Sequence, residues 1–196
     1  MKHLQNGTLL AATLSTGLMA GLFAAFAYSV MPGLARSSDH TLVEAMQRIN
    51  EAIMNPVFML PFVGSIPLLA MAVFFAWRAP GRPALGWLIA ALACYLVAFM
   101  VTSGANVPLN DQLARAGDPD HVRHLAATRR HFEHPWVAWN ILRALLHTAS
   151  FACMAWALMQ FSAHRPDPTD HTAAVAAAAA PSPRVIPALP THGQVR

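Results

Sequence analysis

The chain has 196 residues, of which 56% are hydrophobic and 11% are charged. Soluble domains carry about 25% charged residues, so this composition argues against a soluble domain and predicts a membrane protein with a single domain. The formal net charge is +4, but the basic residues are scattered and form no basic run interleaved with aromatic residues, which argues against a nucleic-acid-binding protein.

Four segments are long and apolar enough to cross a bilayer, which takes about 20 residues. In chain order they are Leu9–Met31, Val57–Trp77, Ala84–Thr102 and Trp136–Phe161. We therefore expect an all-α protein in which residues 1–164 form a four-helix transmembrane bundle. Residues 165–196 are rich in Pro and Ala, have too little bulk for a fifth span, and are predicted to be a disordered tail.

The two long connections are each expected to hold an interfacial helix. Thr41 and Glu44 have the spacing of a capping box, and the apolar stripe after them is typical of a helix that lies at the membrane surface. In the second connection, Asp118 followed by Pro119 predicts a helix start, with an end near Pro135.

The short connection at residues 78–83 contains two arginines and no acidic residue. This pattern favours an integral, multi-pass protein with cytoplasmic termini, in the cytoplasmic membrane if the chain is bacterial. Arginines in the longer loops on the opposite side weaken the charge difference between the two sides.

The fourth span carries polar residues where a membrane helix is usually apolar. Asn140, Arg143 and His147 share one helical face, with Trp136 at its mouth. An arginine near the centre of a membrane helix costs about 2.5–3.5 kcal/mol on insertion scales. Arg143 therefore needs a partner, access to water, or a function.

With four spans, both long connections emerge on the same side of the membrane, toward which the polar face of the fourth span also opens. The polar residues expected to meet at this mouth are Asn50, Glu51, Asn106, Asn110, Asp111, Asn140 and Arg143. Asp111 is the first candidate partner for Arg143, and Glu51 is the second, because a guanidinium matches a carboxylate with two parallel hydrogen bonds. Such a pair serves either as a structural clasp or as part of a site.

Histidines are frequent after Asp118, and His121, His124 and His131 fall near one face of the predicted helix. Imidazoles at this spacing can hold a transition metal, but the surrounding arginines repel cations, so an exposed basic helix is favoured and no metal site is predicted. His147 is either a buried neutral side chain or a general base.

Several segments together resemble the anthrone-oxygenase-like family of small integral membrane proteins, most bacterial members of which have no assigned function. They are Gly21–Phe26, Val30–Leu34, Met46–Asn50, Asn55–Phe58, Asn106–Asp111 and Trp136–Asn140 with Arg143. The resemblance covers nearly the whole chain up to about His164 and implies a four-helix membrane protein. Some relatives oxidise anthrones to anthraquinones with molecular oxygen and no well-established cofactor. The motif positions that carry over are Asn106, Pro108, Asn110, Asp111, Trp139, Asn140 and Arg143.

Two functions follow as hypotheses. In the first, the protein binds or oxidises a planar phenolic or quinone-like molecule that enters from the lipid. Asp111 or His147 would remove a proton, and Arg143 with Asn140 would stabilise the resulting enolate-like oxygen, which then reacts with oxygen without a cofactor. The expected substrate-binding residues are Asn50, Asn106, Asn110, Trp136 and Trp139, with Phe132 as a further aromatic wall.

In the second, the protein is a non-enzymatic membrane subunit or binding protein in which Asp111 and Arg143 form a structural clasp. In both cases the bilayer is a partner, and the sequence leaves the oligomeric state open.

Overall fold

The structure is a computed structural model that describes residues 2–78, 82 and 84–163. Within these residues every regular element is helical, which confirms the all-α prediction. The elements are α1 (Lys2–Ala25), η1 (Phe26–Val30), α2 (Met31–Leu34), α3 (Asp39–Ala52), α4 (Pro56–Arg78), α5 (Leu85–Val101), η2 (Thr102–Asn106), α6 (Val107–Arg115) and α7 (Leu125–Ala163). The predicted disorder of residues 165–196 and most of the short connector lie outside the described residues.

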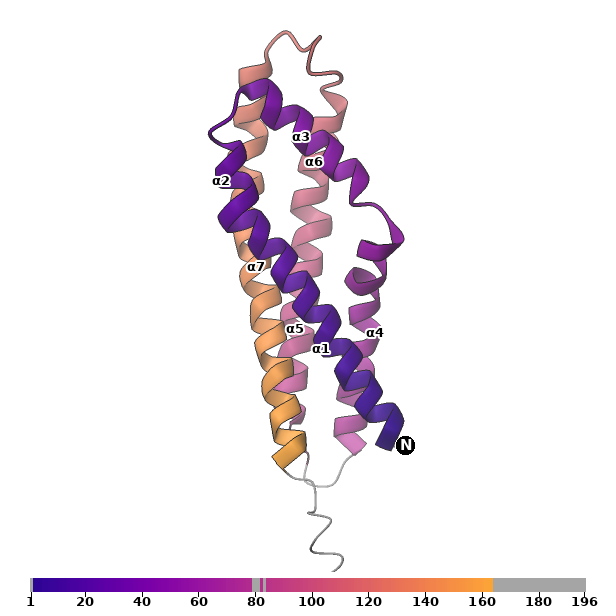
Figure 1. Cartoon of the computed structure of the whole chain (residues 1–196). Coiled ribbons are helices and arrows are strands. Elements are labelled where there is room, and N and C mark those ends of the chain that lie inside the picture. Colours follow the sequence, from indigo (N-terminus) through magenta and orange to yellow (C-terminus); the bar gives the residue numbers. More distant parts are fainter. Residues whose placement is uncertain (1, 79–81, 83, 164–196) are drawn as a thin grey trace, which may run out of the picture. The chain divides into compact units, whose positions relative to one another are not determined.

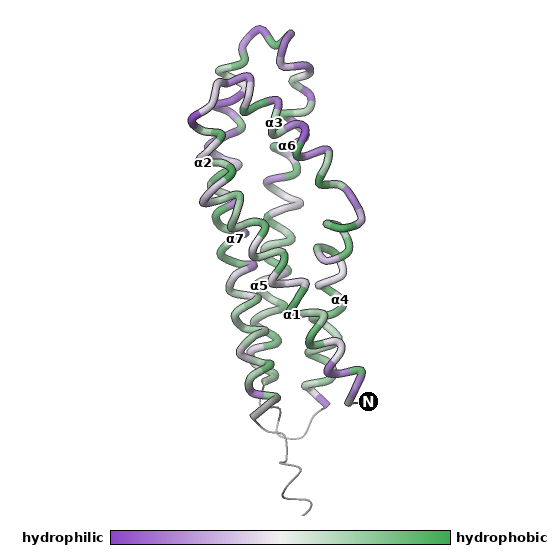
Figure 2. The backbone as a smooth tube through the Cα atoms, in the orientation of Figure 1, coloured by the Kyte–Doolittle hydropathy of each residue, from purple (hydrophilic) through white to green (hydrophobic). Residues whose placement is uncertain are grey.

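Four helices are long and apolar enough to cross a membrane, in agreement with the four predicted spans (Figure 1). They cover His3–Leu34, Pro56–Arg78, Leu85–Arg115 and Leu125–Phe161. Hydrophobic residues follow these helices over most of their length, and hydrophilic residues gather around α3, α6 and the beginning of α7 (Figure 2). The start of α1 and the end of α7 lie at the opposite end of the bundle from α3 (Figure 1).

The first and third spans each contain a π-helical turn. In η1 the Met31 N–H donates to the Phe26 carbonyl, and in η2 the Val107 N–H donates to the Thr102 carbonyl. A π-turn closes its hydrogen bond over five residues rather than four, and such turns occur frequently at functional sites. Because α5, η2 and α6 follow one another without a break, the third span continues as helix to Arg115, beyond its predicted end at Thr102.

The helix predicted in the first long connection begins earlier than the sequence pattern indicates. Ser38 is the N-cap of α3, and its Oγ accepts a hydrogen bond from the Thr41 N–H at 3.1 Å. Thr41 therefore lies in the first turn of the helix, and the predicted capping box from Thr41 to Glu44 is wrong. Of the predicted apolar stripe, Leu42 and Met46 are fully buried, and Ile49 packs against the same hydrophobic cluster.

The helix predicted from Asp118 to Pro135 differs in both bounds. Residues 118–124 form turns, and α7 begins at Leu125 and continues through Pro135 to Ala163. A proline removes one helical hydrogen bond and strains the preceding turn. Here the helix passes through it because Phe132 and Trp136, on either side, are both buried in the same hydrophobic cluster.

Two hydrophobic clusters hold the bundle together. The larger lies among α1, α4, α5 and α7 and includes Leu69, Tyr95 and Met154. The smaller joins the start of α7 to α2, α3 and α6 through residues such as Met46 and Trp136. The candidate site lies where the ends of these two clusters meet.

Candidate ligand pocket

A cavity of about 240 Å³, here called the inner pocket, is bordered on one side by the end of α3. Its walls are mostly aromatic and aliphatic, with a few polar side chains among them. The lining residues are Phe23, Phe26, Ile49, Asn50, Ile53, Met54, Phe58, Met59, Phe62, Val63, Phe99, Thr102, Ser103, Val107, Asn110, Trp136 and Arg143. Apolar walls with a few fixed polar groups are typical of small-molecule sites.

Arg143 is the charged residue of this lining, and its surface is only 6% exposed. Its Nε donates a hydrogen bond to the Asn140 Oδ1 at 3.1 Å. Its guanidinium carbon lies 4.3 Å from the centroid of the Phe23 ring and 5.1 Å from that of Trp136, within the range of cation–π attraction. Among the described residues, no carboxylate forms an ion pair with Arg143.

The predicted pairing of Asp111 or Glu51 with Arg143 is therefore wrong. Both carboxylates are on exposed residues and line a different cavity. The reason is the helical conformation of α6, which keeps Asp111 on the exposed face of that helix. The guanidinium is instead surrounded by aromatic rings and an amide.

Asn140 connects Arg143 to the first span. It is fully buried, and its Nδ2 donates to the Phe23 carbonyl at 3.3 Å while its Oδ1 accepts from Arg143. Both ends of the amide are thereby used. Asn140 fixes the position of the guanidinium relative to the ring of Phe23.

Two further predicted residues, Asn110 and Asn106, form hydrogen bonds with Trp136. The Trp136 Nε1 donates to the Asn110 Oδ1 at 2.7 Å, and the Asn106 Nδ2 donates to the Trp136 carbonyl at 3.2 Å. Trp136 and Asn110 line the inner pocket, and so does Asn50 from α3. Asn106 is buried behind the lining, where its Oδ1 has no partner among the described residues.

His147 and Trp139 do not reach the inner pocket. His147 is fully buried, with its ring centroid 4.8 Å from that of Phe23 and 4.7 Å from that of Tyr95, and neither ring nitrogen has a hydrogen-bond partner among the described residues. Trp139 is 42% exposed on the outside of α7. Phe132 packs against Trp136 at 6.0 Å but is not part of the lining.

Most of the aromatic wall was not predicted as site residues. Phe23 and Phe26 come from the first span, Phe58 and Phe62 from α4, and Phe99 from α5. A signal for the first four is present in the sequence, since each pair is spaced by three or four residues and therefore shares a helical face. That face could not be assigned to a pocket without the packing of the helices.

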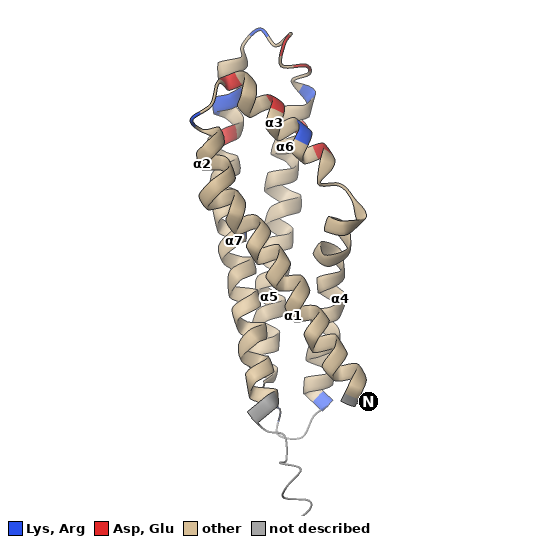
Figure 3. Cartoon of the chain, viewed as in Figure 1, with Lys and Arg blue, Asp and Glu red and all other residues tan. Residues whose placement is uncertain are grey.

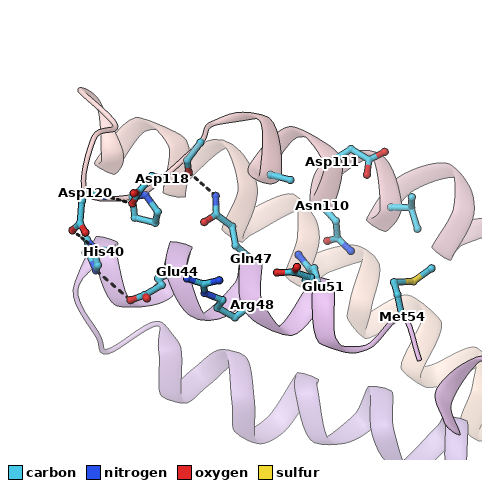
Figure 4. Close-up of a pocket in the computed structure, with 15 residues that line it drawn as sticks. His40, Glu44, Gln47, Arg48, Glu51, Met54, Asn110, Asp111, Asp118 and Asp120 are labelled. Carbon is cyan, nitrogen blue, oxygen red and sulfur yellow. Dashed lines mark hydrogen bonds and ion pairs between the residues drawn. The ribbon is translucent and has the colours of Figure 1, made fainter. Parts of the chain in front are cut away.

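A second, larger cavity of about 720 Å³, here called the outer cavity, lies between α3 and α6 (Figure 4). It is lined by His40, Glu44, Gln47, Arg48, Asn50, Glu51, Met54, Val107, Asn110, Asp111, Ala114, Gly117, Asp118, Pro119 and Asp120. Its lining consists mainly of charged and amide side chains, whereas that of the inner pocket is mainly apolar. The Asp120 N–H donates to the Asp118 carboxylate, and this hydrogen bond, with a smaller contribution from His121, holds the pKa of Asp118 below its usual range.

The histidines near the start of α7 do not gather into a metal site. His121 contacts Asp118 at 3.3 Å, and in the part of the chain that the structure describes no three His, Cys, Asp or Glu side chains lie close enough to hold a metal ion.

The fold and pocket define a small multi-pass membrane protein with a buried arginine in an aromatic pocket. A family model described as anthrone oxygenase matches residues 57–153, which covers α4, α5, η2, α6 and the pocket-lining part of α7. This match confirms the resemblance to the anthrone-oxygenase-like family that the sequence motifs predicted. Comparison with curated proteins and comparison with solved structures gave no match.

Proposed function

We propose that the inner pocket binds a planar aromatic molecule that carries an ionisable oxygen, and that the protein oxidises this molecule with molecular oxygen. The observation that carries the proposal is Arg143, a buried cation on the lining of an aromatic pocket with no carboxylate partner among the described residues. A buried charge is costly unless it is paired. An oxyanion on the ligand would supply the missing partner.

The shape and chemistry of the walls support a ring-shaped ligand. Phe26, Phe58 and Trp136 offer ring faces and edges for stacking. Asn50, whose Nδ2 is buried without a partner among the described residues, offers a neutral donor for a second oxygen. A phenol or an enolisable aromatic ketone has both the flat apolar body and the oxygen that such walls accommodate.

For an anthrone, the proposed reaction begins with loss of a proton from the ring carbon opposite the carbonyl. The electron pair of the broken C–H bond moves into the ring system, and the carbonyl oxygen becomes an enolate that Arg143 stabilises, with Asn140 holding the guanidinium in place. The electron-rich anion then reacts with oxygen. Overall, one anthrone and one O₂ give one anthraquinone and one water, so the substrate is oxidised by four electrons and the oxygen molecule is reduced.

The proton acceptor lies outside the inner pocket in this proposal. The described lining of the inner pocket contains no Asp, Glu or His. Asp111 and Glu51 line the outer cavity, which shares Asn110 with the inner pocket, so a proton can pass to them through water.

That same observation favours a second candidate function, in which the protein binds the aromatic molecule without transforming it. A pocket with a cation but without an adjacent base is suited to retaining an anion. Oxygen consumption separates the two functions, since only the oxidase removes O₂ from solution.

The test uses the purified protein in lipid nanodiscs, with anthrone as the probe and an oxygen electrode as the readout. Arg143→Ala is expected to lower turnover by about 10²–10³-fold, the usual effect of removing an oxyanion donor. Arg143→Lys should retain part of the activity. Arg78→Ala, at the other end of the bundle, is the matched control and should leave turnover unchanged.

Anthrone binding without oxygen uptake by the unaltered protein would support the binding function and reject the oxidase. Equal turnover in Arg143→Ala and the parent would reject the role of Arg143.

We further propose that both termini of the membrane domain face the cytoplasm. The last turn of α4, which ends at Arg78, lies at the same end of the bundle as the start of α1 (Figure 1). The short connection that follows carries Arg82 and no acidic residue, and short basic connections are retained on the cytoplasmic side. The outer cavity then faces the opposite side of the membrane.

A further inference from the structure

The inner pocket and the outer cavity adjoin each other. Four residues line both: Asn50, Met54, Val107 and Asn110. Two of them come from α3 and its end, and two from α6. The side chains of Glu51 and Asn110 point toward each other across the space between these helices (Figure 4).

Hydrogen bonds between the two walls of the outer cavity fix the distance between them. The Gln47 side chain donates to the Leu113 carbonyl at 2.9 Å and to the Gly117 carbonyl at 3.0 Å, which joins α3 to the end of α6. His40 joins the beginning of α3 to Asp120 at 2.8 Å. Because these contacts lie toward one end of the cavity, they leave the part near Asn50 and Asn110 unbridged.

The charge of the outer cavity is opposite to that of the inner pocket. Its carboxylates are Glu44, Glu51, Asp111, Asp118 and Asp120, and its basic residues are Arg48 and His40. A passage lined mainly by one sign of charge raises the local concentration of molecules of the opposite sign and lowers that of like charge. An anion would be repelled here, although Arg143 would attract it further inside.

We propose that the outer cavity is the aqueous entrance to the inner pocket, and that its carboxylates admit neutral and cationic molecules in preference to anions. Asn50, Met54, Val107 and Asn110 form the neck between the two spaces. A ligand with an ionisable oxygen enters in its protonated, neutral form and becomes an anion only beside Arg143. The entrance rests on the geometry of the cavities and does not depend on the proposed oxidation.

Cysteine labelling tests the entrance without any ligand. Cys94 and Cys153 are replaced by Ala, and a single cysteine is introduced as Thr102→Cys, which lies on the lining of the inner pocket and is buried. The probes are a cationic and an anionic methanethiosulfonate, both membrane-impermeant, applied to the protein in nanodiscs. Thr16→Cys, which is also buried but lies outside both cavities, is the control.

We expect Thr102→Cys to react at least ten times faster than Thr16→Cys. Relative to the reactivity of each reagent with a free thiol, the cationic probe should be favoured about 3–10-fold. Adding Glu51→Gln and Asp111→Asn should bring this ratio close to one.

A bulky residue in the outer cavity shows which route the probe takes. Ala114→Trp lies on the lining of the outer cavity and should slow labelling of Thr102→Cys several-fold, whereas Gln112→Trp, on the same helix but outside both cavities, should not. Labelling that is unaffected by Ala114→Trp would mean that the pocket opens elsewhere and would overturn the proposal. So would a Thr102→Cys protein that has the thermal stability of its parent and reacts no faster than Thr16→Cys.

Discussion

At the scale of single residues, the polar side chains on one face of α7 lie in two different environments. Asn140 and Arg143 lie at the inner pocket, where the amide and guanidinium are hydrogen-bonded to each other. His147, one turn further, is enclosed by Phe23, Phe62 and Tyr95. A shared helical face thus does not guarantee a shared site, since Phe23 contacts both Arg143 and His147 but only Arg143 lies on the lining of the inner pocket.

Substitution of His147 tests whether its ring nitrogens lack hydrogen-bond partners. We expect His147→Phe to leave the free energy of unfolding unchanged or to raise it, because a buried polar atom without a partner costs about 1–3 kcal/mol and the ring removes two such atoms. Thermal unfolding in detergent measures this. Tyr95→Phe is the contrasting variant and should lower stability by about 1 kcal/mol, since the Tyr95 hydroxyl donates to the Phe62 carbonyl at 2.7 Å.

If His147→Phe lost stability as Tyr95→Phe does, the ring nitrogens must have hydrogen-bond partners, such as enclosed water. His147 would then again be a candidate general base.

The sequence predicted which polar residues lie at the site better than it predicted which of them contact one another. The spacing of Asn140 and Arg143 placed them together, and the Asn110–Trp136 contact joins two predicted residues. The partner of Arg143 could not be predicted, because whether Asp111 points inward depends on the helical conformation of α6. The contribution of Phe23 depends on how α1 packs against α7, which no local pattern encodes.

At the scale of the elements, the clasp that the sequence led us to expect at Arg143 is found at Arg129. Its guanidinium donates to the Ala35 carbonyl at 2.8 Å and to the Ser37 carbonyl at 3.0 Å. It also forms ion pairs with Asp39 at 3.0 Å and Glu133 at 2.6 Å. One side chain of α7 thereby satisfies carbonyls at the end of α2 and fixes the start of α3.

We predict that Arg129→Ala lowers the free energy of unfolding by about 2 kcal/mol or more, because hydrogen bonds to charged groups contribute about 1.5–3 kcal/mol and several are lost together. Chemical denaturation in detergent, followed by circular dichroism, measures the change. Arg130→Ala is the matched control, since Arg130 is exposed on the adjacent position. Equal stability of the two variants would contradict the role of Arg129.

The spans were predictable because about 20 apolar residues in sequence are a strong and local signal. The bounds of the polar segments were not. Ser38 and Thr41 are both good N-cap residues, and Asp118–Pro119 is a common helix start that here forms a turn. The choice among such signals is made by tertiary contacts, as Phe132 and Trp136 show at Pro135.

At the scale of the whole membrane domain, the charged residues are distributed unequally between the two ends of the bundle. Acidic and basic residues gather around α3, α6 and the start of α7, and a basic residue lies at the other end of the bundle (Figure 3), where α4 ends at Arg78. The end near Arg78 has few charges. The charged residues of the short connection at residues 78–83 are both arginines.

We therefore expect Arg82→Cys to be protected and Arg123→Cys to react when intact cells are treated with a membrane-impermeant thiol reagent. Both variants carry the Cys94→Ala and Cys153→Ala changes, and permeabilised cells, in which both sites should react, are the control. The reverse pattern in intact cells would place the termini outside and the outer cavity in the cytoplasm.

The two π-helical segments, η1 and η2, have a consequence for how this protein can diversify. A π-turn holds one residue more than an α-turn, so losing a single residue from Thr102–Asn106 would turn the segment into ordinary α-helix while α5 and α6 keep their rotational phase. The bundle would persist, and Thr102 and Ser103 would shift along the cavity wall. Single-codon deletions and insertions at these two places are thus an economical evolutionary route to a differently shaped binding chamber on an unchanged membrane scaffold.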